Sequence, residues 1–142
     1  DEHYAGSDAG SVASLPFVED GISRAVSMVP SEQVINAVPF YTRIWTENAG
    51  ETKSRAVGMQ AAMDAMQENG ATAEWDETTG QYYCTYETSA GTVQIWFEED
   101  RSIGEQLNLY SKYKLGGVAE WKLGLETSAV WSIISNGLNN AS

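Results

Sequence analysis

The chain has 142 residues, a length typical of one domain, and its 42% hydrophobic and 20% charged residues exclude an intrinsically disordered protein. The net charge of −12 argues against a nucleic-acid partner, because phosphate binding requires a cationic surface. The chain has one cysteine, one histidine and no apolar run of roughly 18 residues, so we expect no internal disulfide, no His-based metal cluster and no membrane span. No metal site and no cofactor are expected.

The N-terminal part of the chain predicts a loop followed by a helix. Residues 1–13 are rich in glycine and serine and are expected to form the loop. Ser14 is a suitable N-cap, and Pro16 fits the first turn of a helix. Apolar residues then recur at helical spacing until Pro30 ends the helix, which therefore has one apolar face.

A long apolar segment over residues 34–45 predicts a buried parallel strand. Its pairing is expected to weaken at Pro39, because proline lacks the amide donor of a strand ladder. Tyr41, Arg43 and Trp45 alternate along the segment and therefore share a face. An arginine between two aromatic side chains indicates either a binding site or a structural ion pair.

The middle of the chain predicts a small α+β unit. Residues 47–54 are polar and are expected to be exposed, and residues 54–69 have the apolar spacing of a helix. Three alternating stretches joined by glycine-containing turns then predict a three-stranded antiparallel meander, over residues 71–77, 81–88 and 92–98.

The next segment predicts a helix with an acidic start. The three acidic residues 98–100 are explained by helix capping and solvation, and no catalytic role is assigned to them. Ser102 and Glu105 match a capping box, so a helix is expected from this point to about Leu115.

A short strand over residues 116–126 contains Trp121 and is followed by a helix that begins at Thr127, with a frayed tail over residues 139–142. A strand of this kind that leads into a helix is a βα unit of a parallel sheet. Enzymes with parallel barrels keep their active sites at the carboxyl ends of such strands. Spacing alone nevertheless favours a core position for Trp121.

Three stretches of the chain resemble family 18 glycoside hydrolases, and in particular the bacterial branch that includes spore cortex-lytic N-acetylglucosaminidases. Residues 1–7 (DEHYAGS) resemble the segment after the Met-x-Tyr-Asp motif of the sixth barrel strand, with the first residue as the motif's aspartate. Residues 38–45 (VPFYTRIW) resemble the seventh strand, whose usual Pro-x-Tyr-Gly-Arg pattern has Thr42 in place of the glycine here. Residues 95–102 and 116–121 resemble the approach to the eighth strand and the strand itself.

The resemblance implies an α/β fold, namely the C-terminal portion of a TIM (β/α)8 barrel with a small α+β insertion between the last two strands. Residues 1–46 and 99–142 would form the partial barrel, and residues 47–98 the insertion. The family's acid–base motif, Asp-x-x-Asp-x-Asp-x-Glu, does not occur in this sequence. The chain is therefore expected to be a fragment that is inactive by itself and holds no catalytic residue.

The resemblance also implies a site for polysaccharides with N-acetylglucosamine units, such as chitin or peptidoglycan. In this family the substrate's own acetamido group assists the reaction. Asp1 would orient that group, and Trp121 would form the hydrophobic floor under the sugar, which favours a site role for this tryptophan. Tyr41 and Arg43 would line the same cleft, while Trp45 would be a further sugar platform or part of the insertion's packing. The implied location is the bacterial cell envelope, the spore or the extracellular space.

Two other functions agree with the same residues. Tyrosines and tryptophans are numerous and the charge is acidic, which also suits a non-catalytic carbohydrate-binding module. A structural or interaction domain whose aromatic residues all lie in the core is the weaker alternative. A partial barrel would leave a strand edge and an apolar inner face uncovered, so self-association of the chain is expected.

Overall fold

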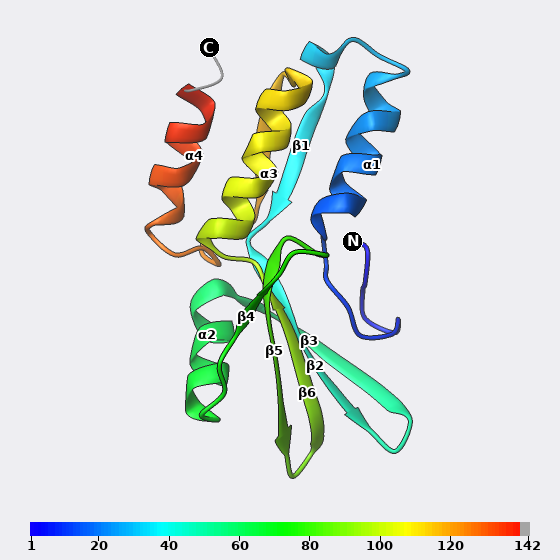
Figure 1. Ribbon diagram of the computed structural model, residues 1–142, viewed down its shortest axis with the longest axis vertical. Coiled ribbons are helices and arrows are strands. Elements are labelled where there is room, and N and C mark those ends of the chain that lie inside the picture. The colour runs from blue at the N-terminus through cyan, green and yellow to red at the C-terminus, as the bar shows by residue number, and fades with distance from the viewer. Residues whose placement is uncertain (140–142) are drawn as a thin grey trace.

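The computed structural model describes residues 1–139, so most of the tail expected to fray lies outside the described residues. Three helices and two strands form one half of the molecule, and five strands with one helix form the other half (Figure 1). The elements are α1 (Leu15–Val26), a 3-10 helix η1 (Ser31–Gln33), β1 (Ile35–Pro39), β2 (Tyr41–Asn48), β3 (Glu51–Gly58), α2 (Met59–Glu68), β4 (Glu74–Asp76), β5 (Gln81–Thr88), β6 (Gly91–Phe97), α3 (Asp100–Tyr113), β7 (Gly117–Trp121) and α4 (Val130–Asn139).

β1 and β7 form a two-stranded parallel sheet. Their register runs from Ile35 opposite Gly117 to Pro39 opposite Trp121. The start of β7 approaches the backbone of η1 so closely that a Cβ atom on Gly116 would lie 2.1 Å from the Glu32 carbonyl oxygen. Only glycine fits there, and this contact fixes where β7 begins beside β1.

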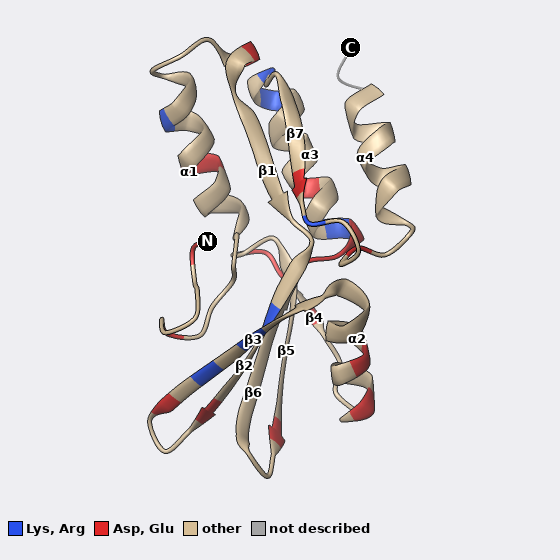
Figure 2. Ribbon diagram, turned by 180° about the vertical axis from the view of Figure 1, so that it is seen from behind, with Lys and Arg blue, Asp and Glu red and all other residues tan. Residues whose placement is uncertain are grey.

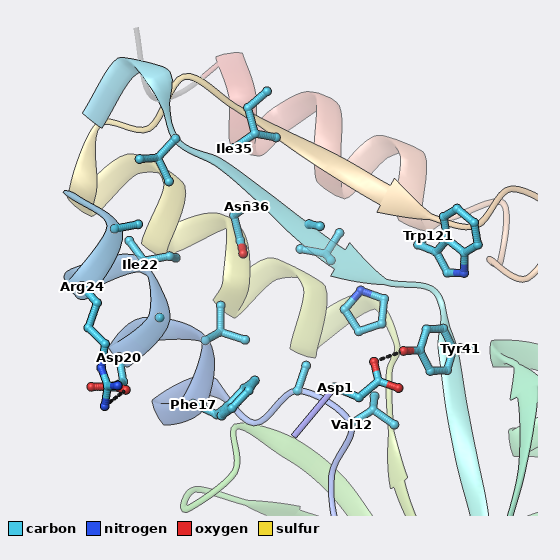
Figure 3. Close-up of a pocket in the computed structure, with 18 residues that line it drawn as sticks. Asp1, Val12, Phe17, Asp20, Ile22, Arg24, Ile35, Asn36, Tyr41 and Trp121 are labelled. Carbon is cyan, nitrogen blue, oxygen red and sulfur yellow. Dashed lines mark hydrogen bonds and ion pairs between the residues drawn. The ribbon is translucent and has the colours of Figure 1, made fainter. Parts of the chain in front are cut away.

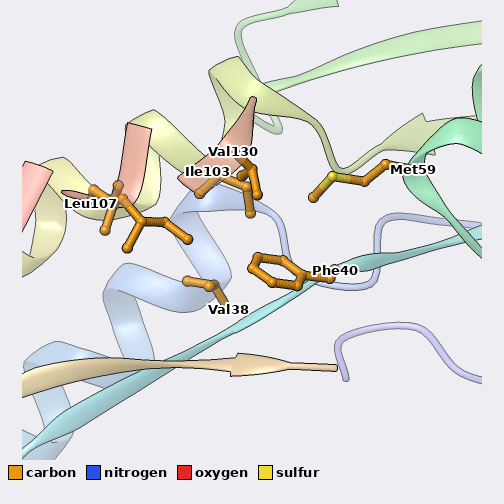
Figure 4. Close-up of a cluster of buried hydrophobic side chains, with 7 residues drawn as sticks. Val38, Phe40, Met59, Ile103, Leu107 and Val130 are labelled. Carbon is orange, nitrogen blue, oxygen red and sulfur yellow. The ribbon is translucent and has the colours of Figure 1, made fainter. Parts of the chain in front are cut away.

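One face of this parallel pair packs on α3 and α4. The shared core consists of fully or almost fully buried side chains from four elements and the segment after β1, namely Val38, Phe40, Met59, Ile103, Leu107, Val130 and Ile134 (Figure 4). The Phe40 ring meets the Trp131 ring edge-on, with 5.7 Å between their centroids. Because Met59 is the first residue of α2, the cluster also ties the two halves of the molecule together.

The second sheet is antiparallel and has the strand order β3-β2-β6-β5-β4. Helix α2 covers one of its faces (Figure 1). The core between helix and sheet contains Ile44, Ala62, Cys84, Val93, Ile95 and Phe97. The sequence predicted three of these strands, β4 to β6, and the structure adds β2 and β3 to them.

The single long strand expected over residues 34–45 is wrong, because the chain changes sheets at Phe40. Pro39 ends the parallel strand, as the missing amide donor predicts. The Phe40 amide then donates to the Trp121 carbonyl, 2.7 Å away, and closes the pair. From Tyr41 onward β2 pairs antiparallel with β3 and β6, so the parallel prediction fails for this part.

The exposed stretch and early helix start expected over residues 47–58 are also wrong. This segment is a hairpin, in which Ala49 and Gly50 adopt positive φ values of 51° and 81° and β3 returns beside β2. Helix α2 begins only at Met59. β3 is an edge strand whose residues are mostly exposed or half-buried, so it lacks the alternation of apolar residues that identifies strands in sequence.

The cap of α3 is formed one turn earlier than expected. The N-cap is Glu99, whose carboxylate accepts from the Ser102 and Arg101 amides at 2.8 and 2.9 Å. The Ser102 hydroxyl in turn accepts from the Glu99 amide at 3.0 Å, which makes a capping box with serine and glutamate exchanged. α3 ends at Tyr113, and α4 begins at Val130 rather than at Thr127.

The charged residues are spread over both halves of the molecule. Figure 2 shows the lysines and arginines distributed over both halves, mainly on α1, α3, β2 and β3. Within residues 1–139, no helix is long and apolar enough to cross a membrane.

Candidate functional site

The carboxyl ends of β1 and β7 lie side by side and bring together residues distant in sequence. Trp121 is the last residue of β7, opposite Pro39, and Tyr41 follows β1 by two residues. Asp1, at the start of the chain, reaches the same place (Figure 3). This edge of a parallel sheet is where ligands bind in α/β proteins, because side chains from successive strands converge there.

Trp121 presents its ring to the surface rather than to the core. Its exposed fraction is 66%, which is large for the biggest apolar side chain. The core position favoured by spacing alone is therefore wrong. An exposed indole beside polar groups offers a flat apolar face on which a sugar ring can stack.

Tyr41 and Asp1 form a hydrogen-bonded pair next to this tryptophan. The Tyr41 hydroxyl donates to an Asp1 carboxylate oxygen (Figure 3). Burial, together with the nearby Glu98, raises the pKa of Tyr41, while Arg43 acts in the opposite direction. Tyr41 therefore stays a protonated donor at neutral pH, and it holds the carboxylate at the rim of the groove.

Arg43 lies on β2 two residues beyond Tyr41, outside the lining of the groove. Its Nη1 donates to the Ser54 hydroxyl at 2.9 Å, and no carboxylate within the described chain lies at ion-pair distance from it. The structural ion pair is thus not observed. Its Nε is buried without a hydrogen-bond partner among residues 1–139, which leaves one donor unused.

Trp45 belongs to the packing and offers no sugar platform. It is 1% exposed, and its indole N–H donates to the Gly10 carbonyl at 2.9 Å. This bond fastens the N-terminal loop across β2. The loop is held further by the Glu2 carboxylate, which accepts from the Ser14 amide at 2.9 Å and so helps to place Asp1 at the site.

A groove of about 720 Å³ runs from these residues along β1 and α1. Apolar side chains line its middle, with Trp121 and Tyr41 at one end and the ion pair of Arg24 and Asp20, 2.8 Å apart, at the other (Figure 3). The groove therefore offers a ligand both an aromatic face for stacking and polar side chains for hydrogen bonding. The described residues contain no cluster of three metal-binding side chains.

Sequence reasoning missed Glu98, which is fully buried instead of solvated. Its carboxyl accepts from the Gln81 side-chain amide at 2.7 Å and lies 2.9 Å from the Ser102 hydroxyl oxygen. Capping does explain Glu99, so the acidic run contains two residues with different environments. The only signal in the sequence was the position of Glu98 directly after the apolar strand β6, one residue before the cap.

A parallel strand pair packed on helices, with aromatic and polar side chains at its carboxyl ends, is typical of parallel-barrel enzymes. The family model described as glycosyl hydrolases family 18 matches residues 6–126. The chain belongs to this family.

Individual relatives agree with this assignment. The chain is 30% identical to the cortical fragment-lytic enzyme of Bacillus subtilis over 139 residues, which is 96% of this chain and 32% of that protein. A chitinase from Chromobacterium violaceum has a TM-score of 0.88 at 27% identity, over 97% of this chain and 43% of the other. The spore cortex-lytic enzyme SleL of Bacillus megaterium has a TM-score of 0.85 at 28% identity. The match covers 94% of this chain and 32% of that enzyme. The predicted fold class, a portion of a TIM barrel that carries an α+β insertion, is confirmed.

Proposed function

We propose that this chain is the C-terminal part of the catalytic domain of a glycosidase that cleaves β-1,4 links next to N-acetylglucosamine in chitin or peptidoglycan. One observation carries the proposal. The exposed ring of Trp121 lies at the same sheet edge as the hydrogen-bonded pair of Tyr41 and Asp1. The similarity to a cortical fragment-lytic enzyme and to a chitinase supports this substrate class.

The proposed reaction is substrate-assisted, retaining hydrolysis. The acetamido oxygen of the sugar attacks its own anomeric carbon while an acid protonates the leaving oxygen. Asp1 orients the acetamide, Tyr41 holds Asp1, and Trp121 supports the apolar face of the distorted ring. Arg43 remains a proposed donor to sugar hydroxyls, and this contact would have to come from Nη2, because Nη1 donates to Ser54 and Nε is buried. The acid–base glutamate lies outside this chain, because its motif is not in the sequence.

The division into a barrel part, residues 1–46 and 99–142, and an insertion, residues 47–98, is part of the same proposal. β2 already belongs to the five-stranded sheet from Tyr41 onward, so a division drawn by sheets would begin the insertion there. We further propose that the whole protein acts in the bacterial cell envelope, in the spore or outside the cell. The open face of the parallel pair supports self-association of the isolated chain.

Binding and hydrolysis of chitotetraose by the purified chain test the proposal. We expect binding that quenches or shifts the tryptophan fluorescence, with no release of reducing ends. Trp121→Ala should weaken binding roughly tenfold, because the stacking surface is lost, which corresponds to about 1.4 kcal/mol. Leu123→Ala is the matched control, since Leu123 is 70% exposed and lies just beyond the strand.

Each outcome separates the candidate functions. Hydrolysis by the chain alone would place the acid within it and contradict the proposal that the acid–base glutamate lies outside this chain. Equal affinity of the wild type and Trp121→Ala would contradict the site. A longer form of the protein that contains the Asp-x-x-Asp-x-Asp-x-Glu motif and hydrolyses chitotetraose supports the glycosidase, whereas one without that motif that only binds supports the carbohydrate-binding module.

A further inference from the structure

Glu98 is a fully buried carboxyl group with no cationic partner within the described residues. It lies between the end of β6 and the start of α3 and is 0% exposed. Oε1 accepts from the Gln81 Nε2 amide at 2.7 Å, and Oε2 lies 2.9 Å from the Ser102 hydroxyl oxygen. A buried carboxylate held only by neutral groups is costly, so a structure of this kind favours the neutral acid.

The hydrogen bonds around Ser102 accommodate a protonated Glu98. The Ser102 oxygen accepts from the Glu99 amide, and it lies 3.0 Å from the Glu99 carbonyl oxygen and 2.9 Å from Oε2 of Glu98. A serine hydroxyl has one hydrogen and two lone pairs. The Glu99 carbonyl already accepts from the Ile103 amide at 3.0 Å, so the Ser102 hydrogen has two acceptors within reach. When that hydrogen goes to the Glu99 carbonyl, a proton on Oε2 of Glu98 completes the contact by donating to Ser102. In agreement, burial raises the pKa of Glu98 well above its usual range.

The same residue is bonded to the strand that carries the candidate site. The Glu98 amide donates to the Thr42 hydroxyl oxygen at 2.8 Å, and Thr42 is fully buried. Thr42 lies between Tyr41 and Arg43, the two polar residues that β2 contributes to the proposed sugar site. Glu98 is also close enough to Tyr41 for a charge on it to raise the pKa of that phenol.

We propose that Glu98 is a buried neutral acid that positions Tyr41 and Arg43 by locking β2 against β5 and the start of α3. Gln81 provides the contact to β5, Ser102 the contact to α3, and Thr42 the contact to β2. The role in sugar binding rests on the function proposed above, whereas the neutral acid and the lock do not. Thr42 replaces the glycine of the resembled family pattern, and its hydroxyl oxygen supplies the acceptor that ties β2 to Glu98.

The pH dependence of unfolding tests the neutral acid without any sugar. An acid whose pKa is raised in the folded state stabilises the protein fully below its unfolded pKa, and this stabilisation is lost as pH rises through the folded pKa. Glu98→Gln keeps both hydrogen bonds, because the amide nitrogen donates to Ser102 and the amide oxygen accepts from Gln81. Relative to the wild type, it should raise the folding equilibrium constant at pH 8, by up to tenfold per pH unit above the unfolded pKa, and have little effect near pH 4.

The other ionisable groups near Glu98 stay in place in this comparison. They are Tyr41 and Arg43 on β2 and Glu99 at the start of α3. Glu77→Gln removes the same charge from an exposed residue and is the matched control, with a pH dependence like that of the wild type. A constant difference between the wild type and Glu98→Gln from pH 4 to pH 8 would overturn the neutral acid.

Chitotetraose affinity tests the positioning role. Glu98→Gln should bind within twofold of the wild type, and Thr42→Val, which removes the acceptor of the Glu98 amide, should bind at least fivefold more weakly. Thr42→Ser keeps the hydroxyl and should restore affinity. Glu98→Ala, which removes the contacts to Gln81 and Ser102, should also bind more weakly. Binding by Thr42→Val or by Glu98→Ala equal to that of the wild type would overturn the role.

A wild type that does not bind chitotetraose would contradict the proposed function alone. The ring signals of Tyr41 in a ¹H–¹³C NMR spectrum then decide the positioning role. They should move in Thr42→Val and stay in Glu98→Gln, with the distant Tyr86 ring unchanged in both variants. Tyr41 signals that stay unchanged in Thr42→Val would overturn the lock itself.

Discussion

The two sheets of this molecule differ in how completely they are covered. The five-stranded sheet has its own helix and a continuous core, in which Ile95 and Cys84 are 0% and 2% exposed. The parallel pair of β1 and β7 packs on α3 and α4 with one face only. On its other face Ile35 and Trp121 keep exposed fractions of 62% and 66%.

This difference separates a self-contained structural unit from a strand pair with one face open to solvent. Antiparallel strands with a helix on one face form a complete structural unit, whereas parallel strands normally have both faces covered. The candidate site lies where the two meet, because Trp121 ends the parallel pair and Tyr41 begins the antiparallel sheet. The candidate site therefore lies where the helical coverage of the sheets ends.

The largest expected effect is the loss of the core that joins the two regions. Phe40→Ala should lower the free energy of unfolding by about 3–5 kcal/mol, because a fully buried ring that contacts Trp131 would be replaced by a cavity. Urea unfolding followed by circular dichroism measures this. Phe17→Ala is the control at a 46% exposed ring, and an equal loss in both variants would contradict the assignment of Phe40 to the core.

The thiol of Cys84 reports on the five-stranded sheet alone. Burial raises the pKa of Cys84 to about 11, so the reactive thiolate is scarce at pH 8, and its side chain is closed off by the sheet and α2. We expect iodoacetamide to label it at least roughly 100-fold more slowly in the folded than in the urea-unfolded chain, or about 2.7 kcal/mol. Labelling of Phe40→Ala sharpens the comparison. Slow labelling would show that the sheet stays closed when the junction is weakened, and fast labelling would show that both regions open together.

Much of this fold could be predicted from the pattern of apolar residues. The helix after Ser14, the strand pairing that weakens at Pro39, the three strands over residues 71–98 and the strand with Trp121 are all in place. β3 could not be predicted, because an exposed edge strand has no apolar alternation. The change of sheets at Phe40 depends on a hydrogen bond to Trp121, a residue far along the chain.

The residues of the candidate site can likewise be sorted into those that the sequence predicts and those that it does not. Tyr41 and Trp121 were predicted from strand alternation and resemblance, and the structure places them at one sheet edge, while their role in binding stays a prediction. Arg43 lies apart from the groove. Glu98 could not be identified, because its environment is built by Gln81 and Ser102 from other elements and no local pattern shows burial of a carboxyl group.

The cap of α3 offers a smaller test at the boundary between the regions. Glu99→Ala should lower the free energy of unfolding by about 1 kcal/mol, since the amides of Arg101 and Ser102 lose their acceptor. Chemical denaturation measures the change, with Glu77→Ala as an exposed control. Equal free energies of unfolding for the two variants would show that the exchanged capping box does not stabilise the protein.

The smallest effect is expected at the open face of the parallel pair. The strand edge and the exposed Ile35 side chain should support weak self-association, so the weight-average mass measured by light scattering should rise with concentration toward that of a dimer. Ile35→Lys places a charge on this face and should reduce the rise, with stability unchanged within about 0.5 kcal/mol because the side chain is exposed. Met28→Lys adds the same charge at a 78% exposed residue outside the strands, and it should leave the association intact. A mass that stays monomeric at every concentration would show that the uncovered face does not by itself recruit a partner, and the contrast between the two sheets would then concern ligand binding alone.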